Sequence, residues 1–503
     1  MVVATYALLV DWDNDGDFLD TGEDVTARTW RVRSSSGRDR DSQLTGRAVA
    51  GRLRAVLNNE SGDYSSFNSA SPLFGNILPG RKVQLTMDGT VIWTGFLSAL
   101  VAEPGVNRAN QAVLEAIGPL GQVNRSEINL PMQTSIATGA TVGAILDEAA
   151  WPAGDRTIDT GQTTIARIFM GEQKTLHALR IVEATEAGFI RETPDGKIAF
   201  EDRNHRLKTP HFTSQATFSD APAAALVYSA IRQEDPTRNI INSFEAPYIL
   251  HSVGSLAVLW THPESGASSP SIDAGESRDF WASYPNPDSG TDAVAVDAWT
   301  TLVVTTDYTA NSQAGGGGDD HTADIGVAVG KFGTTMKITL TNNAAVQVFI
   351  TLLQARGTPV TQSDSVLIKA EDSASQTTYG KQVYRNPSKF MPSSAEAQSW
   401  CDFNLPIYKD PLPGLSIRVS GNRDAAHQTQ VKTRDVSDRI TLVAANNAGL
   451  GINEDFFIES VVHDIDNQNR RHWTDYGTSP ADDFTGMWVL GKGKLGISTR
   501  LTY

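Results

Sequence analysis

The segment Val83–Phe96, VQLTMDGTVIWTGF, contains two short runs of β-forming residues on either side of the pair Asp88-Gly89. An Asp-Gly pair accepts the positive φ angles of a type I′ turn, which joins two antiparallel strands through only two residues. The segment therefore predicts a β-hairpin. Tyr6–Val10 is a further predicted strand that ends in an acidic turn, so residues 1–125 are expected to form a β-domain.

The spacing of the apolar residues changes after this first domain. Thr141–Trp151 and Thr175–Ala187 carry apolar residues at helical spacing, which predicts two helices. Thr141 is expected to cap the first helix, and Gly188 is expected to end the second. Residues 126–215 are therefore predicted to be a small α+β domain.

The rest of the chain is divided by a change in composition. Residues 251–360 contain eleven acidic residues but only four basic ones, with short β-forming runs between turns. This pattern is typical of a β-sandwich, so residues 251–361 are predicted to be an inserted domain. The flanking residues 216–250 and 362–503 combine strands with a capped helix at Ser393–Leu405 and are predicted to form one domain. The whole chain is therefore predicted to be mainly β with α+β parts.

The formal net charge of −16 argues against general nucleic-acid binding, because that function draws on clustered Lys and Arg. Residues 25–54 are an exception, since eight arginines against two aspartates leave a charge of +6. These arginines form either a solvated strand face or a contact surface for an acidic neighbouring subunit. They are Arg28, Arg31, Arg33, Arg38, Arg40, Arg47, Arg52 and Arg54.

Cys401 is the only cysteine of the chain, so no intrachain disulfide can form and assembly in a reducing cytoplasm is expected. We expect Cys401 to be a buried helix residue rather than a nucleophile. The apolar run at the N-terminus, MVVATYALLV, has no basic leader and is too short to span a bilayer. Neither a signal peptide nor a membrane anchor is predicted.

The acidic turn after the first strand matches the first half of a calcium-binding loop. Its alternating carboxylates can converge on one hard cation, and Gly16 permits the sharp bend. The second half does not match, because the bidentate acid is due at Gly22 and Glu23 comes one residue late, with Asp20 and Asp24 as nearby substitutes. The turn is therefore either a calcium site or an acidic turn without metal. The candidate ligands are Asp11, Asp13, Asp15 and Asp17.

Other motifs for catalysis or cofactor binding are missing or incomplete. The nine histidines are scattered, and no zinc-protease, nucleophile-elbow or P-loop pattern occurs. Gly491–Gly496 spells G-x-G-x-x-G, but the chain ends at Tyr503, before the helix and the acidic residue that a dinucleotide site needs. His463 and His472, with Asp464 and Asp466 nearby, invite a metal or general-base interpretation, but we predict that they lie on surface strands. On such a strand His463 and Asp464 should face opposite sides. We therefore predict a protein that is not an enzyme and has no cofactor, calcium apart.

Several segments, taken in order, resemble bacteriophage minor tail and tail-tip (baseplate) hub proteins. Val49–Ser66 and Ser71–Val83 are similar to the opening of these proteins, where an A-G…L-x-N-x-x-G-x-Y-S run precedes P-L-x-G-x-L-x-P-G-R. Gly196–Arg203, GKIAFEDR, is similar to the G-x-I-x-F-x-x-R that ends their second domain. Ile231–Phe244 resembles a strand that re-enters the hub barrel, and Ile350–Gly357 resembles part of a module of phage virion proteins. The inserted domain is the main departure from a minimal hub.

This resemblance implies a structural virion protein at the tail tip, made in the cytoplasm of a bacterial host. Hubs of this family are homotrimers, and each subunit contributes two β-barrels similar to the tail tube. Here the two barrels would be residues 1–125 and residues 216–250 with 362–503. The implied partners are the distal tail or tube protein, the tape-measure protein, and the central fibre or spike. The implied ring surrounds a DNA exit channel, through which DNA would slide if the lumen were acidic.

Two other functions are compatible with the sequence. A carbohydrate- or host-receptor-binding tail protein would use the inserted β-sandwich, with Trp260, Trp281 and Trp299 either as stacking side chains or as core residues. A cell-wall hydrolase carried on the tail is the other alternative, and the missing catalytic signature argues against it.

Overall fold

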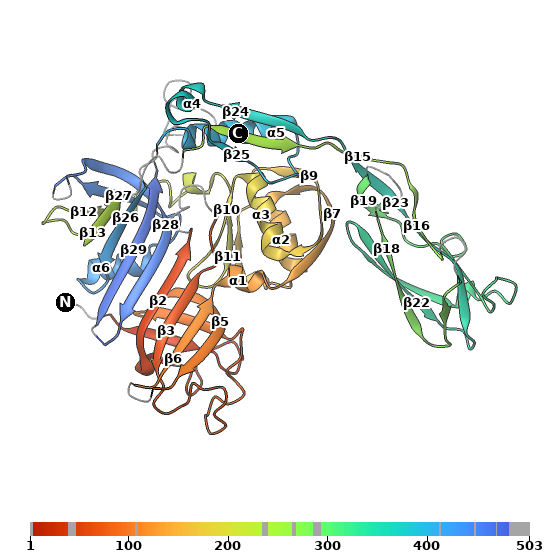
Figure 1. Cartoon of the computed structure of the whole chain (residues 1–503), viewed down its shortest axis with the longest axis horizontal. Helices are drawn as coiled ribbons and strands as arrows, with labels where there is room; N and C mark the ends of the chain where they lie inside the picture. Colours follow the sequence, from red (N-terminus) through yellow and green to blue (C-terminus); the bar gives the residue numbers. More distant parts are fainter. Residues whose placement is uncertain are drawn as a thin grey trace.

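The computed structural model describes residues 4–38, 47–105, 109–233, 240–263, 268–284, 293–411, 414–446, 449–468 and 470–481. Strands dominate these residues, and the longest helices lie near the centre and the top of the molecule in Figure 1. The prediction of a mainly β chain with α+β parts is confirmed.

The largest sheet contains the predicted hairpin. β4 (Lys82–Met87) pairs antiparallel with β5 (Thr90–Glu103). Asp88 and Gly89 between them have φ angles of 49° and 74°, both positive as a type I′ turn requires. The neighbouring strands of this half of the sheet are β1 (Tyr6–Val10), β6 (Gln111–Ile117), β3 (Arg52–Asn58) and β2 (Thr29–Gly37).

The same sheet continues into the C-terminal strands, because β2 pairs antiparallel with β28 (Ile452–Asp466). Beyond β28 lie β29 (Arg471–Pro480), β26 (Leu415–Ser420), β13 (Ala230–Gln233), β27 (Arg439–Ala444) and β12 (Thr217–Ser219). The two predicted barrels are therefore not separate. Within the described part of the chain, their strands form one twelve-stranded sheet whose main path runs from β1 to β13. Local patterns did not reveal this, because the β2–β28 pairing joins opposite ends of the chain.

The predicted α+β domain packs beside this sheet. β7 (Glu127–Ala137) and β9 (Thr164–Lys174) form a two-stranded sheet, and α2 and α3 lie next to it in the centre of Figure 1. A second small sheet has the order β10, β11, β8. The remaining bounds are α1 (Pro119–Val123), α2 (Thr138–Glu148), α3 (Thr175–Glu186), β8 (Arg156–Ile158), β10 (Phe189–Glu192) and β11 (Ile198–Glu201).

The predicted start of α2 was wrong by three residues. The helix begins at Thr138, so Thr141 lies inside it and its Oγ1 donates a hydrogen bond to the Ala137 carbonyl at 3.1 Å instead of capping. The helix starts early because β7 leads directly into it and the Thr138 hydroxyl bonds to the buried Glu186 carboxylate. This long-range partner is invisible to a local cap search.

The predicted end of α3 was also displaced. Ala187, not Gly188, takes the left-handed conformation, with a φ angle of 57°. Glycine is needed at position 188 for another reason, because a Cβ there would lie 2.6 Å from the Glu201 carbonyl oxygen on β11. Gly188 also helps to end the helix, since its N–H donates to the Glu183 carbonyl at 3.0 Å, so the Gly188 signal combined close packing with helix termination.

Residues on both sides of the insert form a separate small core. β14 (Ser243–Tyr248) pairs with β24 (Val366–Glu371) and β25 (Val383–Arg385), and α5 (Ser394–Tyr408) packs against β14 and β24. The predicted Ser393 cap is confirmed, since the Glu396 N–H donates to Ser393 Oγ at 3.0 Å. The other half of the predicted capping box differs, because the Glu396 carboxylate accepts hydrogen bonds from Thr163 and Arg203. Cys401 is buried in this core, as predicted. Two further helices are α4 (Ser373–Tyr379) and α6 (Ala425–Thr433).

The inserted residues form the two packed sheets of a β-sandwich, at the right of Figure 1. One sheet surrounds β23 (Val348–Gln362), and the other has the order β18, β22, β21. Apolar side chains of both sheets share one core. The strands are β15 (His251–Val253), β16 (Ala257–His262), β17 (Ser271–Ile272), β18 (Ser277–Ser283), β19 (Ala293–Trp299), β20 (Tyr308–Asn311), β21 (Ile325–Lys331) and β22 (Thr335–Asn342).

Single 3-10 turns occupy Thr26–Arg28, Ala153–Asp155, His205–Leu207 and Thr322–Asp324. Among the residues that the structure describes, no helix is long and apolar enough to cross a membrane.

Candidate functional site

The acidic turn follows β1 and winds around one buried carboxylate. Asp11 accepts hydrogen bonds from the backbone N–H groups of Asn14 at 2.5 Å and Gly16 at 3.2 Å. Positive φ angles of 68° at Asn14 and 101° at Gly16 allow the tight path. As a result, Asp11, Asp13 and Asp15 each bring one carboxylate oxygen within 4.8 Å of the others. Three of the four candidate ligands therefore converge.

Asp17, the fourth candidate ligand, lies outside the group of converging carboxylates. Its carboxylate accepts the Leu19 N–H at 2.8 Å. A second group instead joins Asp13 to Asp20 and Glu23, again within 4.8 Å. In the sequence, Glu23 comes one residue later than the position at which a calcium loop has its bidentate acid. The structure brings it close because the chain folds back, with the Val10 N–H donating to the Glu23 carbonyl at 2.9 Å.

The electrostatics of this turn indicate unbalanced negative charge. The hydrogen bond and the charge of Asp13 raise the pKa of Asp20, and burial raises the pKa of Glu23. Carboxylate oxygens are the ligands that calcium prefers in proteins. The turn could therefore hold a divalent cation, with Asp13 shared between both groups of carboxylates.

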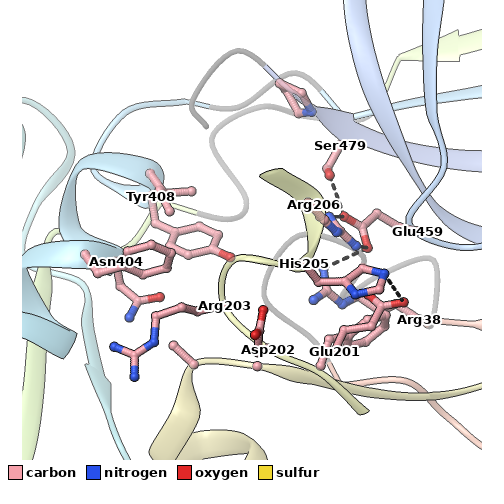
Figure 2. Close-up of a pocket in the computed structure, with 16 residues that line it drawn as sticks. Arg38, Glu201, Asp202, Arg203, His205, Arg206, Asn404, Tyr408, Glu459 and Ser479 are labelled. Atoms are coloured by element: carbon pink, nitrogen blue, oxygen red, sulfur yellow. Dashed lines mark hydrogen bonds and ion pairs between the residues drawn. The ribbon is translucent and has the colours of Figure 1, made fainter. Parts of the chain in front are cut away.

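A second charged cluster lies where the α+β domain meets β2 and β28, and we call it the junction network. Its centre is Glu459 of β28, whose side chain is fully buried. Arg206 contacts both carboxylate oxygens at 2.6 and 2.9 Å, Arg38 contacts one at 2.8 Å, and Ser479 donates to the other at 2.6 Å. Figure 2 shows Arg206, Glu459 and Ser479 converging. Burial alone would raise the pKa of Glu459, but Arg206 and Arg38 outweigh burial and lower it.

The junction network extends through a second buried pair. Arg191 of β10 contacts Glu201 of β11 at 2.5 Å and Asp435 at 2.7 Å. Ser437 donates a hydrogen bond to Glu201 as well. Burial would raise the pKa of Glu201, but the positive charges of Arg191 and its neighbours lower it to about 2. The network thus links the α+β domain to C-terminal residues through buried ion pairs.

The junction network borders a hollow of about 80 Å³. Small-molecule sites usually measure about 300–1,000 Å³, so this hollow is too small for most ligands. His205 at its wall contacts Asp159 at 2.7 Å. The charged groups bind one another, an arrangement that positions domains rather than a substrate.

Sequence reasoning treated His463 and His472 as surface-strand residues, and this was wrong. Both are buried, with His463 Nδ1 and His472 Nε2 3.1 Å apart. Burial lowers the pKa of His463 to about 4, so it is neutral at pH 7. Asp464 points to the opposite side, as predicted, and binds Arg31 at 2.7 and 3.0 Å. Burial also raises the pKa of the Cys401 thiol to about 12, which leaves little thiolate for nucleophilic attack.

The three tryptophans proposed for stacking differ in position. Trp299 is buried, and its Nε1 donates to the Phe332 carbonyl at 2.8 Å. Trp260 is partly buried against the same core. Trp281 is 53% exposed. Core packing therefore accounts for two of them. The Gly491–Gly496 motif lies outside the described residues.

The arginines of the basic segment do not share one setting, and Arg28 and Arg47 lie 3.9 Å from Asp63 and 3.7 Å from Glu183. Arg38 belongs to the junction network, whereas the side chains of four others lie exposed on one face of β2 and β3. On this face Arg31 binds Asp464, and Arg54 lies 3.8 Å from Glu115. The four exposed arginines are Arg31, Arg33, Arg52 and Arg54, while Arg40 falls outside the described residues.

The sequence matches no protein-family model and no curated protein. The fold, in contrast, is similar to that of the tail protein from Neisseria meningitidis MC58, with a TM-score of 0.52 at 10% identity over 96% of this chain and 98% of the other. The chain has the fold of a tail protein. The 43 kDa tail protein of prophage MuSo2 from Shewanella oneidensis is also similar, with a TM-score of 0.48 at 10% identity over 95% and 99% of the two chains.

Only the similarity to the Neisseria meningitidis tail protein is used in the argument, and at 10% identity it concerns the fold alone. It spans nearly the whole of both chains, so it includes the large sheet as well as the domains packed on it. The resemblance to tail proteins that the sequence predicted is confirmed at the level of the fold.

Proposed function

We propose that this chain is a structural protein of a phage tail and that three copies form a hub at the tail tip. The single observation that carries this proposal is the fold similarity to a tail protein over 96% of the chain. The order of the hub-like sequence segments supports the same assignment. In this role the chain would contact the distal tail or tube protein, the tape-measure protein and the fibre or spike, and would surround the DNA exit.

Two features of the large sheet favour self-association. β13 ends the main path of the sheet and has β26 as its one hydrogen-bonded neighbour among the described strands, whereas the outer edge of β1 is already bonded to residues 23–25. An edge such as that of β13 can pair with another chain. The sheet also exposes Arg33 and Arg52, which have no ion-pair partner within the described residues. In the assembled hub we expect these two arginines to meet an acidic surface of the neighbouring copy.

The test of the hub is the mass and shape of the purified full-length chain. We expect three copies by mass photometry and a threefold ring in electron micrographs. The charge-reversed pair Arg33→Glu with Arg52→Glu should weaken the assembly, whereas Lys331→Glu with Lys389→Glu, which changes charge equally elsewhere, should not. A monomer at all concentrations, with no ring, would contradict the proposal.

We also propose that the acidic turn binds Ca²⁺, with Asp11, Asp13 and Asp15 as ligands and Asp20 and Glu23 as additional donors. The convergence of these carboxylates supports this second proposal, together with the raised pKa values of Asp20 and Glu23. A bound cation would offset negative charge that the protein itself leaves unbalanced. Calcium-dependent thermal stability of the full chain tests it.

A further inference from the structure

The inserted β-sandwich has one outer face with an unusual composition, formed by β18, β22 and β21. Side chains alternate along these strands, so one set fills the core and the other faces outward. The outward set on β18 and β22 is mostly hydroxyl-bearing or charged, and on β21 it is small. We call it the Trp281 face: Ser277, Asp279, Trp281 and Ser283 of β18, Thr335, Lys337, Thr339 and Thr341 of β22, and Gly326, Ala328 and Gly330 of β21.

Trp281 is the aromatic centre of this face. Its side chain is 53% exposed, although a tryptophan usually buries most of its surface. The Phe332 ring stacks on it with 6.2 Å between ring centres and 20° between planes. Lys337 Nζ lies 5.9 Å from the Trp281 ring centre. These contacts hold the indole in place while about half of it stays open to solvent, which leaves an aromatic surface of fixed orientation.

Polar groups surround the indole in a fixed arrangement. Asp279 accepts a hydrogen bond from Thr339 Oγ1 at 2.6 Å and forms an ion pair with Lys337 at 2.9 Å. Ser277 and Thr341 are hydrogen-bonded across the same two strands at 2.8 Å. Each of these groups keeps further donors or acceptors for a ligand. The small residues of β21 leave the neighbouring part of the face without bulky side chains.

We infer that the Trp281 face binds an uncharged saccharide. A sugar ring has one face of C–H bonds, which packs on an aromatic ring, and a rim of hydroxyls, which both donate and accept hydrogen bonds. Trp281 supplies the first contact, and Asp279 with Lys337 supplies the second.

The charge of the insert selects the kind of saccharide. On the face itself Asp279 and Lys337 cancel each other. The surrounding insert is strongly acidic, with eleven acidic residues against four basic ones in residues 251–360. Acidic polysaccharides would be repelled at low ionic strength, so neutral ones are favoured. This inference does not depend on the hub proposal, because the face lies entirely within the insert.

The test uses the full-length chain and a printed array of neutral and acidic bacterial surface polysaccharides. We expect retention of at least one neutral polysaccharide. Trp281→Ala should weaken that binding about tenfold or more, as loss of a stacking ring does. Asp279→Asn should weaken it less, and Trp281→Phe should restore part of it. Tyr379→Ala, an exposed aromatic on α4 outside the insert, is the matched control and should bind normally.

Three results would overturn the inference. The array could retain only acidic polysaccharides or none, or Trp281→Ala could bind as the wild type does. Alternatively, Trp281→Ala could change the mass of the assembly, which would make the face a contact between copies. Ring formation by Trp281→Ala with loss of saccharide binding would support the inference and leave the hub proposal intact. A wild-type chain that forms no ring but binds the saccharide would contradict the hub proposal and not this inference.

Discussion

The junction network and the Trp281 face both contain ion pairs, but the two regions use charge in opposite ways. Glu459 is fully buried and is surrounded by Arg206, Arg38 and Ser479. The Asp279–Lys337 pair has a similar distance of 2.9 Å, yet its side chains are 46% and 38% exposed. A buried charge must keep its partners, because water cannot replace them, whereas an exposed charge can exchange its partner for a ligand. Burial therefore separates a structural ion pair from one available for binding.

The largest effect is expected from breaking the centre of the junction network. Glu459→Gln removes the buried carboxylate that Arg206 and Arg38 share, which should cost about 3–5 kcal/mol of unfolding free energy. Urea denaturation followed by tryptophan fluorescence measures this. Asp279→Asn is the control on the exposed pair and should leave the midpoint unchanged. Equal effects from both variants would remove the distinction between the two regions.

A smaller effect is expected from acid. The folded pKa of Glu201 is about 2, below its ordinary value of 4.5, because Arg191 and neighbouring charges outweigh burial. A lowered carboxyl pKa adds stability that is complete above pH 4.5 and is lost as pH falls toward 2. This contribution is on the order of 3 kcal/mol. The stability of the wild type should therefore fall more steeply between pH 5 and 3 than that of Glu201→Gln. If the unfolding free energies of the wild type and Glu201→Gln fall in parallel with pH, the pKa of Glu201 is not lowered in the folded protein.

The smallest effect concerns the acidic turn. Calcium at about 100 times its dissociation constant should stabilise the chain by about 2.7 kcal/mol, seen as a rise in melting temperature. Asp13→Asn should abolish this rise, because Asp13 belongs to both groups of converging carboxylates. Asp17→Asn should retain it, since that carboxylate binds the Leu19 N–H instead. A wild type that ignores calcium, or equal responses of the two variants, would contradict calcium binding.

Short-range signals predicted much of this molecule. The Asp88-Gly89 turn, the Ser393 cap and the sandwich composition of the insert depend on neighbouring residues, and each appears where expected. The burial of Cys401 in a helix was also predictable, because a free cysteine behaves as a small apolar residue. The convergence of the Asp11, Asp13 and Asp15 carboxylates was predictable from their spacing, since one tight turn brings them together.

Only the tertiary structure decided the features that depend on distant partners. Pairing of β2 with β28 merges two predicted barrels into one sheet, and folding back of the chain replaces Asp17 by Glu23 near the acidic turn. The junction network joins Arg38, Arg206 and Glu459 from three distant segments. From the sequence, Trp260, Trp281 and Trp299 could not be distinguished as stacking residues. In the structure Trp281 is the most exposed of the three. In each case the deciding factor is a contact between residues far apart in the chain, or the burial of a residue by distant parts of the chain. Local sequence patterns contain no information about such contacts.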